Sequence, residues 1–161
     1  MLCFFACHSD TPLFTCQQIN EQLEIIKTSG RINKWYTIVK IVSPEDDIEE
    51  IITVEKSRTD EFNVTYFIHT KDNNDNIRYK KNQKVILKNN KKYEIIRNIE
   101  KINTKLSTWS GQIILDGYYY ELEINSIDAK TIMILSEISF ESGSGMEPIK
   151  TWIDNVRSLK K

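Results

Sequence analysis

Apolar and polar residues alternate along much of the chain, and this alternation predicts β-strands. The clearest stretch is FNVTYFIHT, in which apolar residues take every second position from Phe62 to Ile68. The stretch YYYELEI, from Tyr118 to Ile124, repeats the pattern. Because successive side chains of a strand point to opposite faces, each segment predicts a strand with one dry and one wet side.

Eight strands are expected, and short polar turns join them in sequence order. They cover residues 35–42, 49–58, 62–71, 77–89, 92–102, 108–115, 118–125 and 131–140. Polar links such as KDNNDN at 71–76 and Asp116-Gly117 are typical of hairpin turns. The sequence therefore predicts a mainly β fold, an antiparallel eight-stranded meander. Its closure into a barrel would remove the exposed edges.

Two amphipathic helices are expected at either end of these strands. Residues 16–28 follow Thr15, a suitable cap, and end at Ser29-Gly30, while Pro148 suits the first turn of a helix over 148–159. The apolar stripes are Cys16, Ile19, Leu23 and Ile26 in the first helix, and Ile149, Trp152, Ile153, Val156 and Leu159 in the second. We expect each helix to pack its stripe on the sheet.

Two families resemble parts of this pattern. The stretch RINKWYTIVKI at 31–41 resembles the first conserved region of lipocalins, in which a tryptophan, here Trp35, closes the barrel floor. This resemblance implies an eight-stranded barrel that holds a small apolar or amphipathic ligand. Its candidate ligand-binding residues are Trp35, Tyr66, Tyr120, Leu122 and Ile134. The last strand and a helix with a central Trp152 also resemble the end of a pleckstrin-homology domain, whose C-terminal helix plugs an open barrel.

The chain opens with MLCFFAC, an apolar stretch in an otherwise polar protein. FFAC resembles the lipobox of bacterial lipoproteins, which implies acylation of Cys7 and a place in the cell envelope, or secretion. Residues 1–14 are then a signal remnant and tether, and 15–161 form a single β-barrel domain. The alternative is an apolar tag that packs on the body or frays. No apolar run is long enough for a transmembrane helix, so a lipid anchor would be the only contact with a membrane.

Charge is balanced overall but divided along the chain. The formal net charge is -1, with eight acidic residues between Ser43 and Glu61 and ten basic residues between Arg78 and Lys105. The candidate basic surface consists of Lys80, Lys84, Lys88, Lys92 and Arg97. Such a surface would attract an acidic protein or lipid headgroups, whereas the few interleaved aromatic residues argue against nucleic acid. The alternative is a solvated face.

No set of residues predicts catalysis, a metal or a cofactor. His8 and His69 have no second histidine or cysteine at metal-binding spacing. The loop from Asp72 resembles the start of a calcium loop, but Ile77 stands where the glycine belongs and Gln83 where the glutamate belongs. We therefore interpret that loop as a hairpin turn and expect no enzyme.

Two functions remain open. The first is a non-enzymatic binding protein whose barrel holds a small ligand, which requires an interior void. The second is a protein-interaction module, of inhibitor or immunity type, that docks through charged hairpins and has a filled core.

Overall fold

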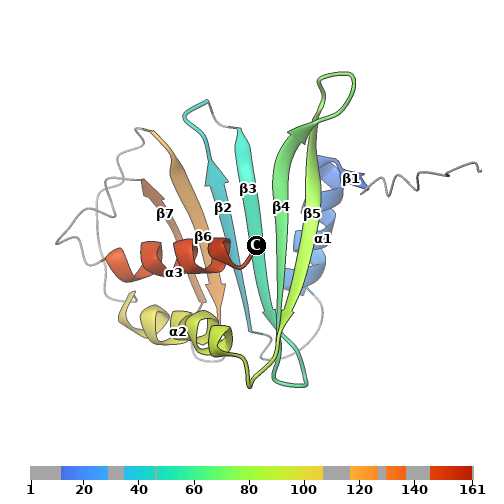
Figure 1. Ribbon diagram of the computed structural model, residues 1–161. Coiled ribbons are helices and arrows are strands. Elements are labelled where there is room, and N and C mark those ends of the chain that lie inside the picture. Colours follow the sequence, from blue (N-terminus) through green and yellow to red (C-terminus); the bar gives the residue numbers. More distant parts are fainter. Residues whose placement is uncertain are drawn as a thin grey trace, which may run out of the picture.

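The computed structural model describes residues 12–28, 35–45, 47–106, 117–126, 130–136 and 146–160, apart from a few side chains near the end of the second helix (Figure 1). Within these ranges the chain forms one antiparallel sheet of seven strands and three helices. The prediction of a mainly β fold is confirmed. The sheet is open, however, and is not closed into the predicted barrel.

The elements follow the order β1, α1, β2, β3, β4, β5, α2, β6, β7 and α3. Their bounds are β1 Leu13–Phe14, α1 Cys16–Thr28, β2 Tyr36–Val42, β3 Ile48–Lys56, β4 Phe62–Lys71, β5 Ile77–Ile86, α2 Lys91–Leu106, β6 Tyr119–Asn125, β7 Lys130–Ser136 and α3 Glu147–Ser158. Six of the predicted strands are present in the sheet, and both predicted helices pack on it. The ends of these elements differ from the predicted ones by at most a few residues. The predicted strand at 108–115 and the end of the last one, at 137–140, lie outside the described residues.

The prediction of a strand at 92–102 is wrong, because these residues belong to helix α2. Tyr93, Ile96 and Ile99 recur every third residue and are all buried, so they form the inward stripe of a helix. Asn90 caps the helix, since its side-chain oxygen accepts the Lys92 backbone N–H at 2.9 Å. The isoleucines favoured a strand in the sequence, but their burial follows the helical period.

The strand order explains why the described strands do not close into a barrel. The strands lie in the order β1-β5-β4-β3-β2-β6-β7, so β1 and β7 are at opposite edges. Strands β2 to β5 form a meander of hairpins, as expected. The chain then crosses the sheet through α2, and β6 pairs with β2 on the far side. A barrel would require the meander to continue from β5 to a neighbouring strand.

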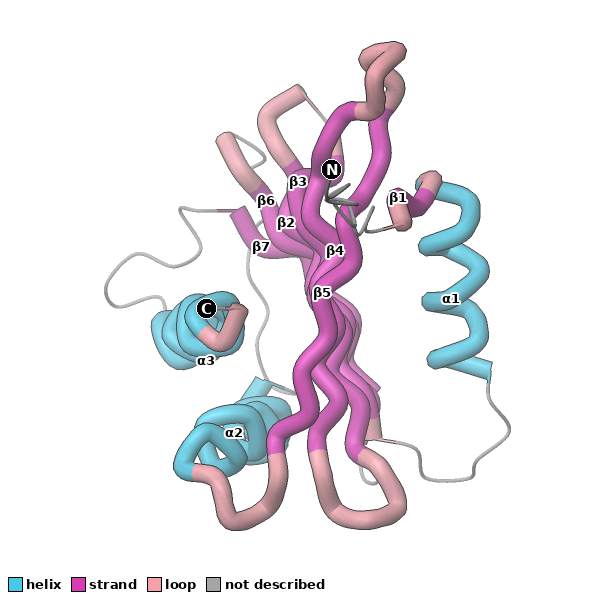
Figure 2. Tube along the Cα trace, turned by 45° about the vertical axis from the view of Figure 1, so that its right-hand side comes forward, coloured by secondary structure: helices cyan, strands magenta, loops and turns pink. Residues whose placement is uncertain are grey.

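The helices cover both faces of the sheet (Figure 2). Helices α2 and α3 lie on one face, called here the α3 face, and α1 lies on the other, the α1 face. The larger apolar cluster joins the sheet to α2 and α3, and includes Trp35, Val39, Ile52, Val64, Tyr66, Leu122, Ile96, Trp152 and Val156. The smaller cluster lies under α1 and consists of Ile19, Leu23, Ile26, Tyr36, Ile38, Ile51, Phe67 and Tyr79. The central strands are thus buried on both sides, not dry on one side and wet on the other as predicted.

Helix α1 begins where the sequence predicts and for the expected reason. The Thr15 hydroxyl accepts the Gln18 backbone N–H at 3.2 Å, and the Gln18 side chain accepts the Thr15 N–H at 2.9 Å. This reciprocal pair is a capping box. Of the predicted stripe, Cys16 is the exception, because it is exposed beside Tyr79 and does not join the core.

Candidate functional site

The residues predicted to line a barrel cavity do not surround one space. Trp35, Tyr66 and Leu122 are fully buried in the cluster under α2 and α3, with Tyr120 almost so. The Tyr66 hydroxyl donates to the Val156 carbonyl oxygen at 2.7 Å, which ties β4 to α3. Ile134 alternates with Met133 and Leu135 along β7, so its side chain points to the opposite face of the sheet, the α1 face. The other four residues therefore pack the core, and Ile134 lies on the other side of the sheet.

An open groove on the α1 face holds two of the predicted residues. It measures about 470 Å³ and lies between α1 and strands β2, β6 and β7; we call it the α1 groove. Apolar side chains on this face come from Leu23, Ile38, Ile132 and Ile134; Leu122 and Met133 also border the groove, but their side chains point to the α3 face. Ile132, on the edge strand β7, is 68% exposed. A second groove of about 470 Å³ runs between α2 and α3, beside Trp152 and Ile102.

Glu123 is the charged centre of the α1 groove. Its carboxylate accepts a hydrogen bond of 2.7 Å from the Tyr36 hydroxyl and pairs with Lys27 at 3.2 Å and Lys130 at 3.1 Å. Burial raises the pKa of Glu123, but the hydrogen bonds from Tyr36 and the two lysines outweigh it, so the pKa is lowered. Burial, followed by the bond to Glu123, raises the pKa of Tyr36. The groove thus has an apolar floor and a rim of charges that are already paired.

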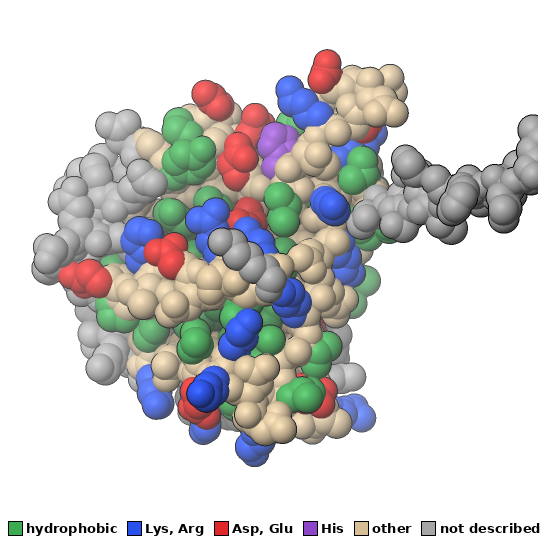
Figure 3. Space-filling view, in the orientation of Figure 1, with side chains coloured by type: hydrophobic (Ala, Val, Ile, Leu, Met, Phe, Trp, Pro, Cys, Tyr) green, Lys and Arg blue, Asp and Glu red, His purple; other side chains and the backbone are tan. Residues whose placement is uncertain are grey.

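The structure divides the predicted basic residues between a strand and a helix. Lys80 and Lys84 occupy alternate positions of β5 and point to the α3 face, opposite Ile68 and Val64 of β4. Lys92 and Arg97 lie exposed on α2, not on a second strand as expected. Lys and Arg side chains extend over the middle and lower part of this face (Figure 3). We keep the name basic surface for Lys80, Lys84, Lys88, Lys92 and Arg97.

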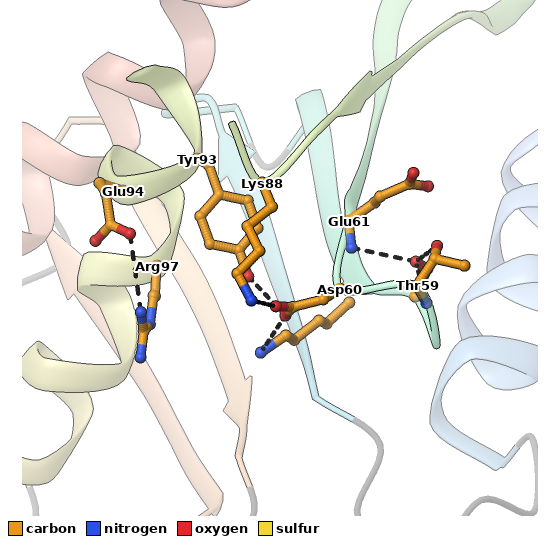
Figure 4. Close-up of polar contacts among 9 residues, drawn as sticks. Thr59, Asp60, Glu61, Lys88, Tyr93, Glu94 and Arg97 are labelled. Atoms are coloured by element: carbon orange, nitrogen blue, oxygen red, sulfur yellow. Dashed lines mark hydrogen bonds and ion pairs between the residues drawn. The ribbon is translucent and has the colours of Figure 1, made fainter. Parts of the chain in front are cut away.

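Lys88 has a structural partner in Asp60 (Figure 4). Asp60, in the turn between β3 and β4, pairs with Lys88 and with Lys56 at 2.9 Å, and accepts a 2.7 Å hydrogen bond from the Tyr93 hydroxyl. The Lys88, Tyr93 and Lys56 donors hold the pKa of Asp60 well below its usual range. Asp60 therefore fastens the β3–β4 turn to the start of α2, and Lys88 contributes to the fold as well as to the basic surface.

Glu50 is a buried carboxylate that the sequence reasoning missed. Its side chain is 5% exposed on the α3 face of β3, where Arg157 Nε donates to it at 3.1 Å and Lys160 Nζ pairs with its other oxygen. Lys160 also lies 5.7 Å from the centre of the Tyr66 ring. The sequence did contain a signal for this. Glu50 lies at an alternate position with Ile52 and Val54, so its side chain belongs to the same, otherwise apolar face of the strand. Two cations on one carboxylate add positive charge to this face, two strands away from Lys80.

The candidate calcium loop is a hairpin turn, as predicted. Asp72 accepts the backbone N–H groups of Asn74 at 2.9 Å and Asn76 at 3.0 Å and pairs with Arg78 at 3.0 Å. Its carboxylate is thus committed to the turn. In the described part of the chain, no group of three His, Cys, Asp or Glu side chains is placed to hold a metal ion. Cys7 and His8 lie outside the described residues.

No helix in the described ranges is both long and apolar enough to cross a bilayer.

Comparison with family models, curated proteins and solved structures gives no match for this chain. The resemblances to lipocalins and to pleckstrin-homology domains therefore stay predictions.

Proposed function

We propose that this chain is a non-enzymatic protein-interaction module that binds an acidic partner through the basic surface. The observation that carries the proposal is the packed α3-face core beneath that surface. Tyr66 and Trp35, which a ligand barrel would turn toward its cavity, are instead buried against other side chains and a helix backbone. A filled core leaves the surface as the place for recognition.

Charge supports the choice of surface. Lys80 and Lys92 are exposed and form no ion pair with any side chain in the described ranges, so their charges face the solvent. The second cation on Glu50 adds further positive charge on the same face, two strands away from Lys80. Unpaired cations on one face raise the association rate with an acidic partner and select against basic ones.

The test is purification from the native source at low salt, followed by mass spectrometry of the intact assembly. We expect a bound acidic protein that dissociates at high salt, because screening weakens exposed charge pairs. The double variant Lys80→Glu/Lys84→Glu should lose that protein. Lys71→Glu is the matched control, because Lys71 is exposed on the α1 face across the same hairpin. Equal recovery with both variants would contradict the proposal. Binding to anionic vesicles in place of a protein would point to lipid headgroups.

A second candidate is an amphipathic small ligand in the α1 groove. The volume of about 470 Å³ suits a small molecule, and Ile132 offers an exposed apolar contact beside the charges of Glu121 and Lys40. The same mass spectrum would then show a retained small molecule. Ile132→Asp should abolish that retention without affecting a protein partner on the α3 face.

A further inference from the structure

Within the described part of the chain, strand β5 has an open edge over most of its length. The short strand β1 covers only its upper part, where Phe14 lies opposite Tyr79 and Leu13 opposite Lys80. From Lys81 to Ile86, no described residue pairs with this side of β5, and Figure 2 shows the strand at the near edge of the sheet. Val85 is 51% exposed and Gln83 is also exposed, so these two side chains on the stretch are open to solvent.

The residues that direct their backbone groups to the open side can be identified from the hairpin. The Asp72 N–H donates to the Asn76 carbonyl at 3.0 Å across the β4–β5 turn. In an antiparallel pair, residues that exchange bonds with the neighbour alternate with residues that face away. Because Asn76 bonds to the β4 side, the even-numbered residues of β5 form the backbone hydrogen bonds with β4. Lys81, Gln83 and Val85 therefore present their N–H and C=O groups to the open side.

The side chains along this edge differ between the two faces. Lys80 and Lys84 lie on the α3 face. The α1 face carries Val85 and, next to a shallow pocket of about 220 Å³, Lys81 and Gln83. An added strand would place alternate side chains against these two surfaces. Acidic residues fit the first, and apolar or small polar residues fit the second.

We infer that the edge of β5 from Lys81 to Ile86 binds an extended acidic segment of the partner as an added antiparallel strand. The inference rests on the proposed function and specifies how the partner is held. The pairing of β1 with Tyr79 and Lys80 shows that the same edge accepts an antiparallel strand. The lysines beside the edge select an acidic one.

A second copy of this chain fits the edge poorly. Two β5 edges paired antiparallel about Gln83 would place Lys80 and Lys84 of both copies on the same face, with Lys84 of one copy diagonally across from Lys84 of the other. Like charges across a strand pair are destabilising, and lysine on an edge opposes edge-to-edge association. The lysines thus disfavour self-pairing and favour an acidic strand.

The probe is a fluorescent eight-residue peptide of alternating glutamate and valine, with the lysine–valine peptide as its control. We expect the acidic peptide to bind and the basic one not to bind. Gln83→Pro removes one outward N–H and leaves the bonds to β4 in place, because this N–H faces away from β4. It should weaken binding about tenfold, whereas Gln83→Ala, which keeps the N–H, should stay within about twofold. Circular dichroism checks that both variants fold.

Amide hydrogen exchange of the wild-type protein is the second measurement. Addition of the acidic peptide should protect the amides of Lys81, Gln83 and Val85, while those of Asn82 and Lys84 are already protected by β4. If the peptide binds in a salt-dependent way without this alternating protection, strand addition is wrong and the proposed charge docking stands. A peptide that does not bind at all overturns the inference. A dimer in sedimentation, lost in Gln83→Pro, would assign the edge to self-association.

Discussion

Asp60 shows how one surface carboxylate joins segments that are distant in sequence. Its partners come from the end of β3, the turn after β5 and the first turn of α2. Asp60 also has a positive φ of 60°, a conformation that aspartate and asparagine tolerate better than most residues. Asp60→Asn therefore keeps the backbone preference, removes the charge and replaces one acceptor oxygen with an NH2 donor.

The first prediction concerns acid stability. Because the Lys88, Tyr93 and Lys56 donors lower the pKa of Asp60 in the folded protein, its contribution to stability is present at neutral pH. That contribution is lost as the pH falls below the ordinary aspartate pKa toward the lowered one. We expect Asp60→Asn to be less stable than wild type at pH 7, with a smaller difference at pH 3. Urea unfolding at both pH values measures this. A difference that grows toward pH 3 would contradict it.

Trp152 has the corresponding role in the apolar core. It is 2% exposed, and its indole N–H donates to the Ile96 carbonyl at 3.0 Å, which joins α3 to α2. Trp152→Ala should lower the free energy of unfolding by about 3–5 kcal/mol, the usual cost of deleting a buried aromatic ring. Trp152→Phe keeps an aromatic ring and loses the hydrogen bond, so it should cost less. Denaturant unfolding measures both. A loss below about 1 kcal/mol for the alanine variant would mean that α3 is loosely attached.

At the scale of elements, the sequence was most informative for segments whose apolar residues fit only the helical or only the strand period. Helix α1 and strand β4 match their predicted ranges because only one period, with clear ends, fits each segment. Helix α2 was mistaken for a strand because Tyr93, Ile95 and Ile99 also satisfy an alternating pattern. Ile95 is the misleading residue, since it lies at the α2–α3 groove and not in the inward stripe. The cap at Asn90 was the signal that would have separated the two interpretations.

That cap gives the prediction at this scale. Asn90→Ala removes the side-chain acceptor for the Lys92 N–H and should destabilise the protein by about 1 kcal/mol. Asn89→Ala, at the preceding exposed position, should change stability by less than about 0.5 kcal/mol. Thermal or urea unfolding of the two variants measures the difference. Equal stability would show that the start of α2 is held by packing and Asp60 alone.

At the scale of the whole molecule, the meander of β2 to β5 was predictable and the final topology was not. Short polar turns fix neighbouring hairpins locally. The pairing of β6 with β2 joins segments separated by the whole of β3, β4, β5 and α2, and no local pattern specifies it. The candidate site was likewise only partly predictable from the sequence. The sequence identified Lys80 and Lys84 as basic, but the open edge beside them exists only because α2 leaves the sheet after β5.

The last prediction concerns where the folded domain is held. We propose that Cys7 is acylated and anchors the protein to a membrane of the cell envelope. A single acyl chain binds a bilayer only marginally, whereas several chains, at about 0.8 kcal/mol per buried methylene, make the anchor durable. Expressed with the upstream sequence of its gene, the wild-type protein should therefore appear in the membrane fraction and Cys7→Ser in the soluble fraction. Cys16→Ser is the matched control, since Cys16 is an exposed thiol on α1 and its loss should leave the protein on the membrane. If wild type and Cys7→Ser distribute equally between the two fractions, Cys7 is not a membrane anchor. The basic surface would then have to bind its partner in solution.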